Sequence, residues 1–277
     1  MFTEYLTALE ARANQAIKTV EGDYIKDGLL YCGKCHTPKQ CKVTAFEKTF
    51  YPKCLCQCEI EREAKEKEEA EKRDLMERIK RYRKMGFPES QMQYWTFAND
   101  DQSRPKLTEM AKRYVNNFDK FYREGKGLLL HGDVGTGKTY IACMIANALI
   151  DKGYPVLVTN FARILNTLQG TFDRQEYLDS LNQFKLLVID DLGVERDTGF
   201  AKEQVFNIID SRYRAGKPMI ITTNLTMQRL ATETELSDKR VYDRIIERCF
   251  PVEVSGESRR VKKLISSREE MKSLLGI

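Results

Sequence analysis

The segment from Gly132 to Thr139, GDVGTGKT, places the strongest constraint on what this chain can fold into. An apolar run typical of a β-strand, GLLLH, precedes it directly, and the apolar helical pattern YIACMIANALI follows it. Glycines at this spacing predict a phosphate-binding loop, because they let backbone N–H groups and the positive end of the helix face phosphate oxygens. We expect Lys138 to contact the β- and γ-phosphates of ATP and the Thr139 hydroxyl to coordinate Mg²⁺. The expected nucleotide-binding residues are Gly132, Asp133, Val134, Gly135, Thr136, Gly137, Lys138, Thr139 and Tyr140.

Short apolar runs typical of β-strands alternate with helical patterns from Gly127 onward. Continuous apolar strands that alternate with helices are typical of a parallel sheet covered on both faces. We therefore predict an α/β fold with a parallel sheet, in a P-loop ATPase domain. The five runs are GLLLH, PVLVT, FKLLVID, PMIITT and FPVEV.

Acidic and amide side chains follow two of these runs. The run FKLLVID ends in Asp190 and continues into Asp191, and Asn224 follows the run PMIITT. We expect Asp190 to hold Mg²⁺ or its waters and Asp191 to polarise the attacking water, with Glu195 as an alternative base. Asn224 is expected to hydrogen-bond that water or the γ-phosphate, although a simple turn residue is the alternative interpretation.

Arginines near the C-terminus are candidates for stabilising the transferring phosphoryl group, whose charge calls for a guanidinium from the same chain or from a neighbouring subunit. We predict Arg244 as a finger that acts across a subunit boundary, with Arg240 as the second candidate. Arg260 is expected to sense the nucleotide within its own subunit. Arg248 and Arg259 are interpreted as solvated, and a basic nucleic-acid surface is the alternative for the whole group.

Six of the eight cysteines lie between Cys32 and Cys58. Such clustering in a reducing compartment indicates a metal site rather than disulfides, and two Cys knuckles commonly surround tetrahedral Zn²⁺. We predict one structural zinc ion, because a module this short lacks the apolar residues for a core of its own. Unligated thiols are the alternative. The expected ligands are Cys32, Cys35 and two of Cys54, Cys56 and Cys58, with Cys41 and His36 in reserve.

The remaining pattern predicts a small, helix-rich N-terminal domain joined to the ATPase domain by a charged helix. Apolar positions in residues 1 to 25 recur at helical spacing, and residues 59 to 84 interleave both charge signs without glycine or proline. We expect an N-terminal helix and zinc module at 1–60, a linker helix at 61–86 and the ATPase domain at 87–277. No apolar run is long enough to cross a bilayer, so we expect a cytoplasmic protein.

Taken in order, GDVGTGKT, LLVIDDLG, ITTN, VYDRIIERC and GESRR resemble the AAA+ ATPases of the DnaC/DnaI helicase-loader family, with IstB-type transposition ATPases as close relatives. The resemblance extends from about Phe87 to Arg260. The roles it implies are Walker A at Gly132 to Thr139, Walker B at Asp190 and Asp191, sensor 1 at Asn224, an arginine finger at Arg244 and sensor 2 at Arg260.

This resemblance implies a loader that binds a DnaB-type hexameric helicase through its N-terminal module and contacts single-stranded DNA through its ATPase domain. Hydrolysis of MgATP would depend on self-association through the ATP site. A net charge of +5 is compatible with a nucleic-acid partner. Phe161 is a candidate for stacking on DNA bases, with ordinary helix packing as the alternative, and Arg163 is a candidate phosphate contact. The alternatives are a transposition accessory ATPase that binds double-stranded DNA and a nucleotide-sensing adaptor with negligible turnover.

Overall fold

The computed structural model describes residues 19–45, 48–193, 198–259, 268, 271–272 and 274–276. These residues divide into two compact units, Met1–Met76 and Glu77–Ile277, and the domain boundaries at 60 and 86 stay a prediction. Most of the amphipathic helix predicted within residues 1 to 25 lies outside the described ranges.

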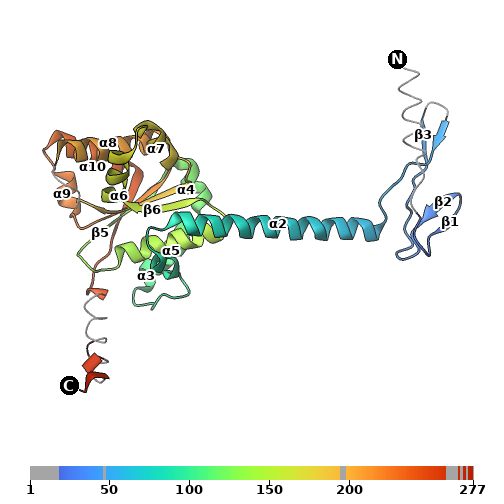
Figure 1. Cartoon of the computed structure of the whole chain (residues 1–277), viewed down its shortest axis with the longest axis horizontal. Coiled ribbons are helices and arrows are strands. Elements are labelled where there is room, and N and C mark those ends of the chain that lie inside the picture. Colours follow the sequence, from blue (N-terminus) through green and yellow to red (C-terminus); the bar gives the residue numbers. More distant parts are fainter. Residues whose placement is uncertain are drawn as a thin grey trace, which may run out of the picture. The chain divides into compact units, whose positions relative to one another are not determined.

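The N-terminal unit contains two small antiparallel hairpins (Figure 1). Strand β1 (Tyr24–Lys26) pairs with β2 (Leu29–Tyr31), and β3 (Val43–Ala45) pairs with β4 (Lys48–Phe50). Asp27 and Gly28 connect β1 to β2 with positive φ angles of 53° and 73°, as the tight turn of a two-residue hairpin requires. Short hairpins of this kind bury little apolar surface and need another source of stability.

Helix α2 (Gln57–Gly86) confirms the charged helix predicted from the sequence. Its side chains are exposed over most of its 30 residues, and pairs such as Lys72 and Glu68 lie one turn apart. The helix ends at Gly86, where a Cβ atom would lie only 2.7 Å from the carbonyl oxygen of Val156. Glycine is therefore required for the close approach of this helix end to the sheet.

The second unit contains a five-stranded parallel sheet in the order β6-β7-β8-β5-β9. This confirms the predicted parallel α/β fold, and all five apolar runs form strands. Their bounds are β5 (Gly127–His131), β6 (Val156–Asn160), β7 (Leu186–Leu192), β8 (Met219–Thr223) and β9 (Cys249–Glu253).

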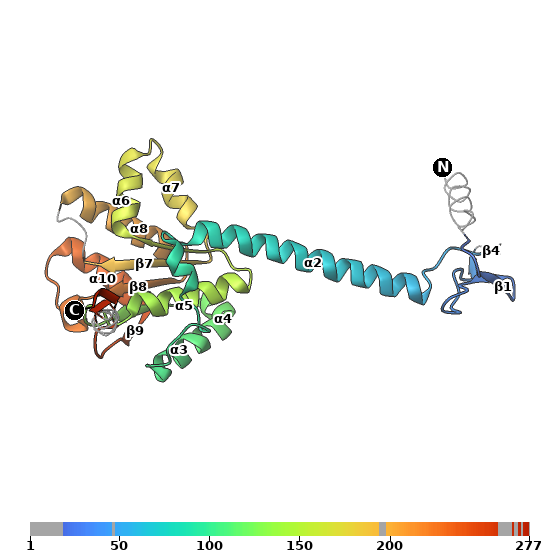
Figure 2. The ribbon, with the colours of Figure 1, turned by 60° about the horizontal axis from the view of Figure 1, so that its bottom comes forward.

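Helices cover both faces of this sheet (Figure 2). On one side lie η1 (Ser90–Tyr94), α3 (Pro105–Asn116), α4 (Phe118–Glu124) and α5 (Lys138–Asp151). On the other lie α6 (Phe161–Gly170), α7 (Arg174–Leu181), α8 (Gly199–Arg214), α9 (Met227–Ala231) and α10 (Leu236–Arg248).

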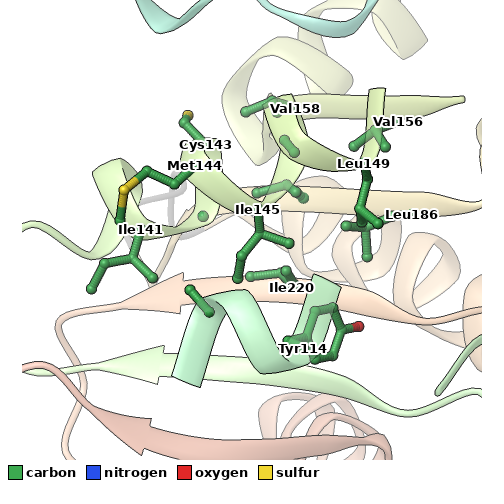
Figure 3. Close-up of a cluster of buried hydrophobic side chains, with 14 of the residues drawn as sticks. Tyr114, Ile141, Cys143, Met144, Ile145, Leu149, Val156, Val158, Leu186 and Ile220 are labelled. Atoms are coloured by element: carbon green, nitrogen blue, oxygen red, sulfur yellow. The ribbon is translucent and has the colours of Figure 1, made fainter. Parts of the chain in front are cut away.

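Alternate residues of each strand enter two separate apolar cores. Leu128 and Leu130 of β5 face the core built on α5 and α3, whereas Leu129 faces the core built on α6, α8 and α10. Figure 3 shows the first of these cores, with Ile145 of α5 close to Ile220 of β8. Burial on both faces explains why the strands are continuously apolar.

Candidate nucleotide site and metal centre

A cavity of about 1110 Å³ opens at the carboxyl ends of β5, β7 and β8. Its lining includes Lys138 and Thr139 from the start of α5, Asp191 from β7 and Asn224 directly after β8. Ligands of open α/β sheets bind at this edge, where the strands end and the loops begin. The lining thus brings together residues that the sequence analysis selected from three separate segments.

The ammonium group of Lys138 is held by three oxygens. Its Nζ donates to the carbonyl oxygens of Gly132 at 2.9 Å and Asp133 at 2.8 Å, and to Asn224 Oδ1 at 2.7 Å. Lys138 therefore connects the start of the P-loop to the start of α5, and connects both to the residue that follows β8. Direct contact between Lys138 and Asn224 places the predicted sensor residue beside the P-loop.

The backbone of the loop excludes larger residues at Gly132. This residue has a φ of 142°, and a Cβ atom there would lie 2.4 Å from the carbonyl oxygen of Val254. Helix α5 begins at Lys138, within the loop segment, so its first N–H groups face the cavity mouth. The predicted phosphate-binding conformation is compatible with this arrangement.

The predicted magnesium ligands are in direct contact. Thr139 Oγ1 donates to Asp190, with distances of 2.8 Å to Oδ1 and 3.1 Å to Oδ2. Burial raises the pKa of the Asp190 carboxyl and the nearby Asp191 adds to this, while hydrogen bonds from Thr222 and Thr139 oppose it. A hydroxyl and a carboxylate oxygen are ligands that Mg²⁺ prefers, so this pair fits the ion.

Asp191 has an unusual backbone conformation for a residue with a side chain. Its φ is 57°, and the pairing of β7 with β8 shifts register between Ile189 and Leu192. This bulge exposes Asp191 at the cavity wall, whereas Asp190 faces Thr139. Adjacent acids, which would alternate across a regular strand, therefore both reach the same site.

Two arginines that the sequence analysis did not select line the cavity. Arg104, just before α3, donates to the carbonyl oxygens of Thr136 and Glu257. Burial lowers the pKa of Arg104, and the nearby Arg259 lowers it further. Two guanidinium groups at one wall favour a bound anion.

Arg259 was interpreted as a solvated residue, and the structure shows otherwise. Its guanidinium lies 4.3 Å from the ring centroid of Tyr140, and its Nη2 is 2.8 Å from Asp101 Oδ2. The only sequence signal was its position beside Arg260. Arg104 carried no signal, because nothing in its local pattern distinguishes it from other polar loop residues.

Arg244 belongs to α10, where it contacts α8, and it lies outside the lining of the cavity. Its Nε donates to Asp210 Oδ1 at 2.7 Å, and its guanidinium lies 4.7 Å from the ring centroid of Phe206. Arg240 is exposed one turn away.

Arg248 is half-buried over Tyr213, at 4.7 Å from its ring centroid, so its interpretation as a solvated residue is wrong. Arg260 and Glu195 lie outside the described residues.

Four cysteine sulfurs form a candidate zinc site in the N-terminal unit. The Sγ atoms of Cys32, Cys35, Cys56 and Cys58 all lie within 4.8 Å of one another. Tetrahedral Zn²⁺ with Zn–S bonds of about 2.3 Å places its sulfurs about 3.8 Å apart, so the cluster fits with small adjustments. A hydrogen bond with Thr37 lowers the pKa of Cys35 to about 5, whereas burial raises the pKa of Cys56.

Cys54 lies outside this cluster. Its Sγ is 3.4 Å from the carbonyl oxygen of Pro38, and burial raises the pKa of its thiol to about 11. The exposed Cys41 contacts the carbonyl oxygen of Pro52, and His36 Nδ1 lies 3.4 Å from the Tyr24 hydroxyl. The structure thus brings Cys56 and Cys58, rather than Cys54, to the first Cys pair.

A buried ion pair supports the first knuckle of the cysteine cluster. Lys39 Nζ lies 2.7 Å from Asp23 Oδ2, and the two side chains are only 5% and 3% exposed. Asp23 Oδ1 also accepts the N–H of Gly33, between Cys32 and Cys35, at 3.1 Å. The hydrogen bond from Lys39 is the main reason why the pKa of Asp23 falls to about 2.

The proposed DNA contacts differ in their surroundings. Phe161 is 1% exposed and packs in the second core, so helix packing explains it and its interpretation as a stacking residue is wrong. Arg163 is exposed on α6 and stays a candidate. In the described part of the chain, none of the helices is both long and apolar enough to span a bilayer.

A P-loop on a parallel sheet, with a paired hydroxyl and carboxylate beside it, defines a nucleotide-binding α/β protein. The family model described as "IstB-like ATP binding protein" matches residues 63–267. The chain therefore belongs to the IstB-like ATP-binding family.

The chain is similar to two replicative helicase loaders. It is 29% identical to DnaI of Bacillus subtilis (strain 168), with 60% of this chain and 58% of that protein covered. It is 31% identical to DnaC of Escherichia coli (strain K12), with 49% of this chain and 55% of that protein covered. The matches therefore span little more than half of each relative.

A crystal structure of DnaI has a similar fold. It superposes with a TM-score of 0.53 and 27% identity, covering 65% of this chain and 99% of that structure. The similarity between this chain and DnaI is therefore found in the fold as well as in the sequence.

Proposed function

We propose that this protein is an ATP-dependent helicase loader, which binds a DnaB-type hexameric helicase and single-stranded DNA and delivers the helicase during replication initiation in the cytoplasm. One observation carries the nucleotide part: Lys138, Asn224 and the Thr139–Asp190 pair meet at the carboxyl ends of parallel strands. The similarity to DnaI and DnaC supports the loader part.

In this proposal the chain hydrolyses ATP with residues that lie around the cavity. Lys138 contacts the β- and γ-phosphates, Asn224 orients the attacking water and Asp191 polarises it. Thr139 and Asp190 would hold Mg²⁺, which supplies electrostatic stabilisation of phosphate charge when bound. Asp191 suits its role because it is exposed in the cavity, whereas Asp190 is engaged by hydroxyl groups.

The proposed active site is completed by a second copy of the chain. Arg244 would act as the finger in a neighbour's site, and Arg260 would sense the nucleotide in its own. Asp210 and Phe206 hold Arg244 away from its own cavity, which is compatible with a role in trans. Self-association would then control turnover.

The N-terminal unit is proposed to contact the helicase. Zinc bound by Cys32, Cys35, Cys56 and Cys58 would stabilise this small unit, since its hairpins bury few apolar side chains. Helix α2 is charged and exposed, which suits a spacer that connects the helicase-binding unit to the ATPase domain.

A transposition accessory ATPase that binds double-stranded DNA is the second candidate. The match to the IstB-like family favours it, because the nucleotide site of such a protein would have the same P-loop and acids. The cysteine cluster and the charged helix favour the loader, since they provide a separate partner-binding unit.

The test is to mix the full-length protein with candidate hexameric replicative helicases, with and without ATP, and to measure complex formation by size-exclusion chromatography. We expect a complex with the parent protein and its loss in the Cys56→Ser variant, whose ATP binding should persist. Cys54→Ser is the matched control and should keep the complex.

Other outcomes separate the alternatives. Tight binding to double-stranded DNA without a helicase complex would favour the transposition ATPase. A helicase complex that forms with ATP but shows no hydrolysis, with or without single-stranded DNA, would favour a nucleotide-sensing adaptor.

A further inference from the structure

A single buried hydroxyl group joins the two acids of the nucleotide site. Thr222 of β8 is 0% exposed, and its Oγ1 donates to Asp190 Oδ1 at 2.6 Å. The same oxygen accepts the backbone N–H of Asp191 at 2.9 Å. A hydroxyl has one hydrogen and two lone pairs, so it can make both contacts at once. The two contacts together fix its orientation.

The contact with Asp191 replaces regular strand pairing. The ladder between β7 and β8 shifts register between Ile189 and Leu192, and Asp191 adopts the left-handed conformation in this bulge. A residue with a Cβ atom rarely adopts this conformation without support from its surroundings. The hydroxyl of Thr222 provides that support, because it binds the N–H group at the bulge.

The contact with Asp190 fixes the other acid. Thr222 and Thr139 approach the same carboxylate, so Asp190 is oriented from β8 and from α5 together. Among the described residues, the Thr222 hydroxyl bonds to Asp190 and Asp191, whereas Lys138 donates to Gly132, Asp133 and Asn224. Thr222 therefore reaches the P-loop through Asp190 and its hydrogen bond with Thr139.

The next residue on the same strand provides a comparison. Thr223 is equally buried, but its Oγ1 donates to the carbonyl oxygen of Leu192 at 2.8 Å and accepts the N–H of Leu225 at 3.0 Å. These contacts hold backbone only. Two neighbouring threonines thus have the same burial and the same number of lone pairs, and only one of them reaches the acids.

We propose that Thr222 is a positioning residue for ATP hydrolysis, whose one hydroxyl sets the geometry of Asp190 and Asp191 relative to each other. This inference rests on the proposed ATPase function. It predicts that loss of the Thr222 hydroxyl lowers turnover and the Mg²⁺-dependent part of nucleotide binding, and leaves the Mg²⁺-independent part unchanged.

The experiment compares substitutions in two matched pairs. Thr222→Val removes the hydroxyl at nearly constant volume, and Thr222→Ser and Thr222→Ala differ from each other only by the hydroxyl. Affinity for a fluorescent ATP analogue is measured with and without Mg²⁺, and hydrolysis is measured at saturating ATP. Thermal unfolding of each variant shows whether it is folded.

We expect Thr222→Val to lower turnover about 10- to 100-fold, because misplacing a catalytic group by about 1 Å can cost about 100-fold, while affinity without Mg²⁺ changes less than about twofold. The gain in affinity on adding Mg²⁺ should shrink as well. Thr222→Ser should recover most of both quantities, Thr222→Ala should not, and Thr223→Val should leave the Mg²⁺-dependent gain at the parent value.

The inference is wrong if Thr222→Val hydrolyses ATP like the parent, or if the serine and alanine variants behave alike. Should the valine variant fail to fold, the serine and alanine pair decides. Should the parent itself show no hydrolysis under any condition, the proposed ATPase fails, and the Mg²⁺-dependent gain in affinity still tests Thr222.

Discussion

At the scale of single residues, three neutral oxygens accept hydrogen bonds from the main cation of the nucleotide site. Two carbonyl oxygens of the loop and the amide oxygen of Asn224 surround the ammonium group of Lys138. The lysine thus orders the loop as well as supplying charge. Asn224 accepts one of these hydrogen bonds, and Gly132 and Asp133 of the loop accept the other two.

Lys138→Ala should weaken ATP binding about 100-fold, because each hydrogen bond from a charged donor contributes about 1.5–3 kcal/mol. Asn224→Ala should retain affinity within a few-fold and lower hydrolysis instead. Isothermal titration calorimetry and a phosphate-release assay measure the two effects. Equal nucleotide affinity of Lys138→Ala and the parent would contradict the assigned P-loop.

The cysteine cluster leads to a prediction about metal content. We expect one zinc ion per chain in the parent and in Cys54→Ser, and a large loss in Cys56→Ser, since only the latter removes one of the four clustered sulfurs. Elemental analysis of the purified proteins measures this. Zinc lost equally from both variants would show that Cys54 is a ligand. A parent protein without zinc would contradict the predicted zinc site.

At the scale of elements, one buried arginine joins α8 to the amino ends of two strands. Arg212 is 1% exposed, and its guanidinium donates to the carbonyl oxygens of Phe184 and Lys185 before β7 and of Pro218 before β8. Burial lowers the pKa of Arg212 to about 10, so it stays charged at neutral pH. It satisfies backbone acceptors that would otherwise be buried without donors.

Arg212→Met should lower the free energy of unfolding by about 3 kcal/mol, because several buried carbonyl oxygens lose a charged donor. Arg214→Met is the control on the same helix. The Arg214 side chain is 76% exposed in its pair with Asp210, and such surface pairs contribute at most about 1 kcal/mol. Chemical denaturation of both variants tests this, and similar stabilities would contradict it.

At the scale of the whole molecule, the nucleotide site and the predicted finger belong to different parts of the same domain. Arg244 is held by Asp210 between α8 and α10, and the cavity lies at the carboxyl ends of the strands. The proposed completion of the site by a second chain would account for this separation. It would also make turnover depend on protein concentration.

Arg244→Ala and Lys138→Ala should each abolish most hydrolysis, for different reasons. An equimolar mixture should recover part of it, because some shared sites then combine Lys138 from one chain with Arg244 from another. The measurement is steady-state hydrolysis against mixing ratio. Parent-like hydrolysis by Arg244→Ala alone would exclude the finger, and no recovery on mixing would exclude its action in trans.

Several features were predictable because their signals are local in sequence. The P-loop glycines, the apolar strands and the charged helix α2 each depend on neighbouring residues, and the structure contains all three. The contact between Thr139 and Asp190 was predictable too, since parallel strands end at one edge of their sheet. Arg260 and Glu195 stay predictions.

The sequence alone therefore determined the α/β class, the phosphate loop and the candidate acids of this protein. Only the tertiary structure separated Cys54 from the other cysteines, buried Phe161 and brought Arg104, Arg259 and Thr222 to the nucleotide site. The physical reason is that periodicity and spacing describe a residue's own segment, whereas these contacts join segments distant in the chain.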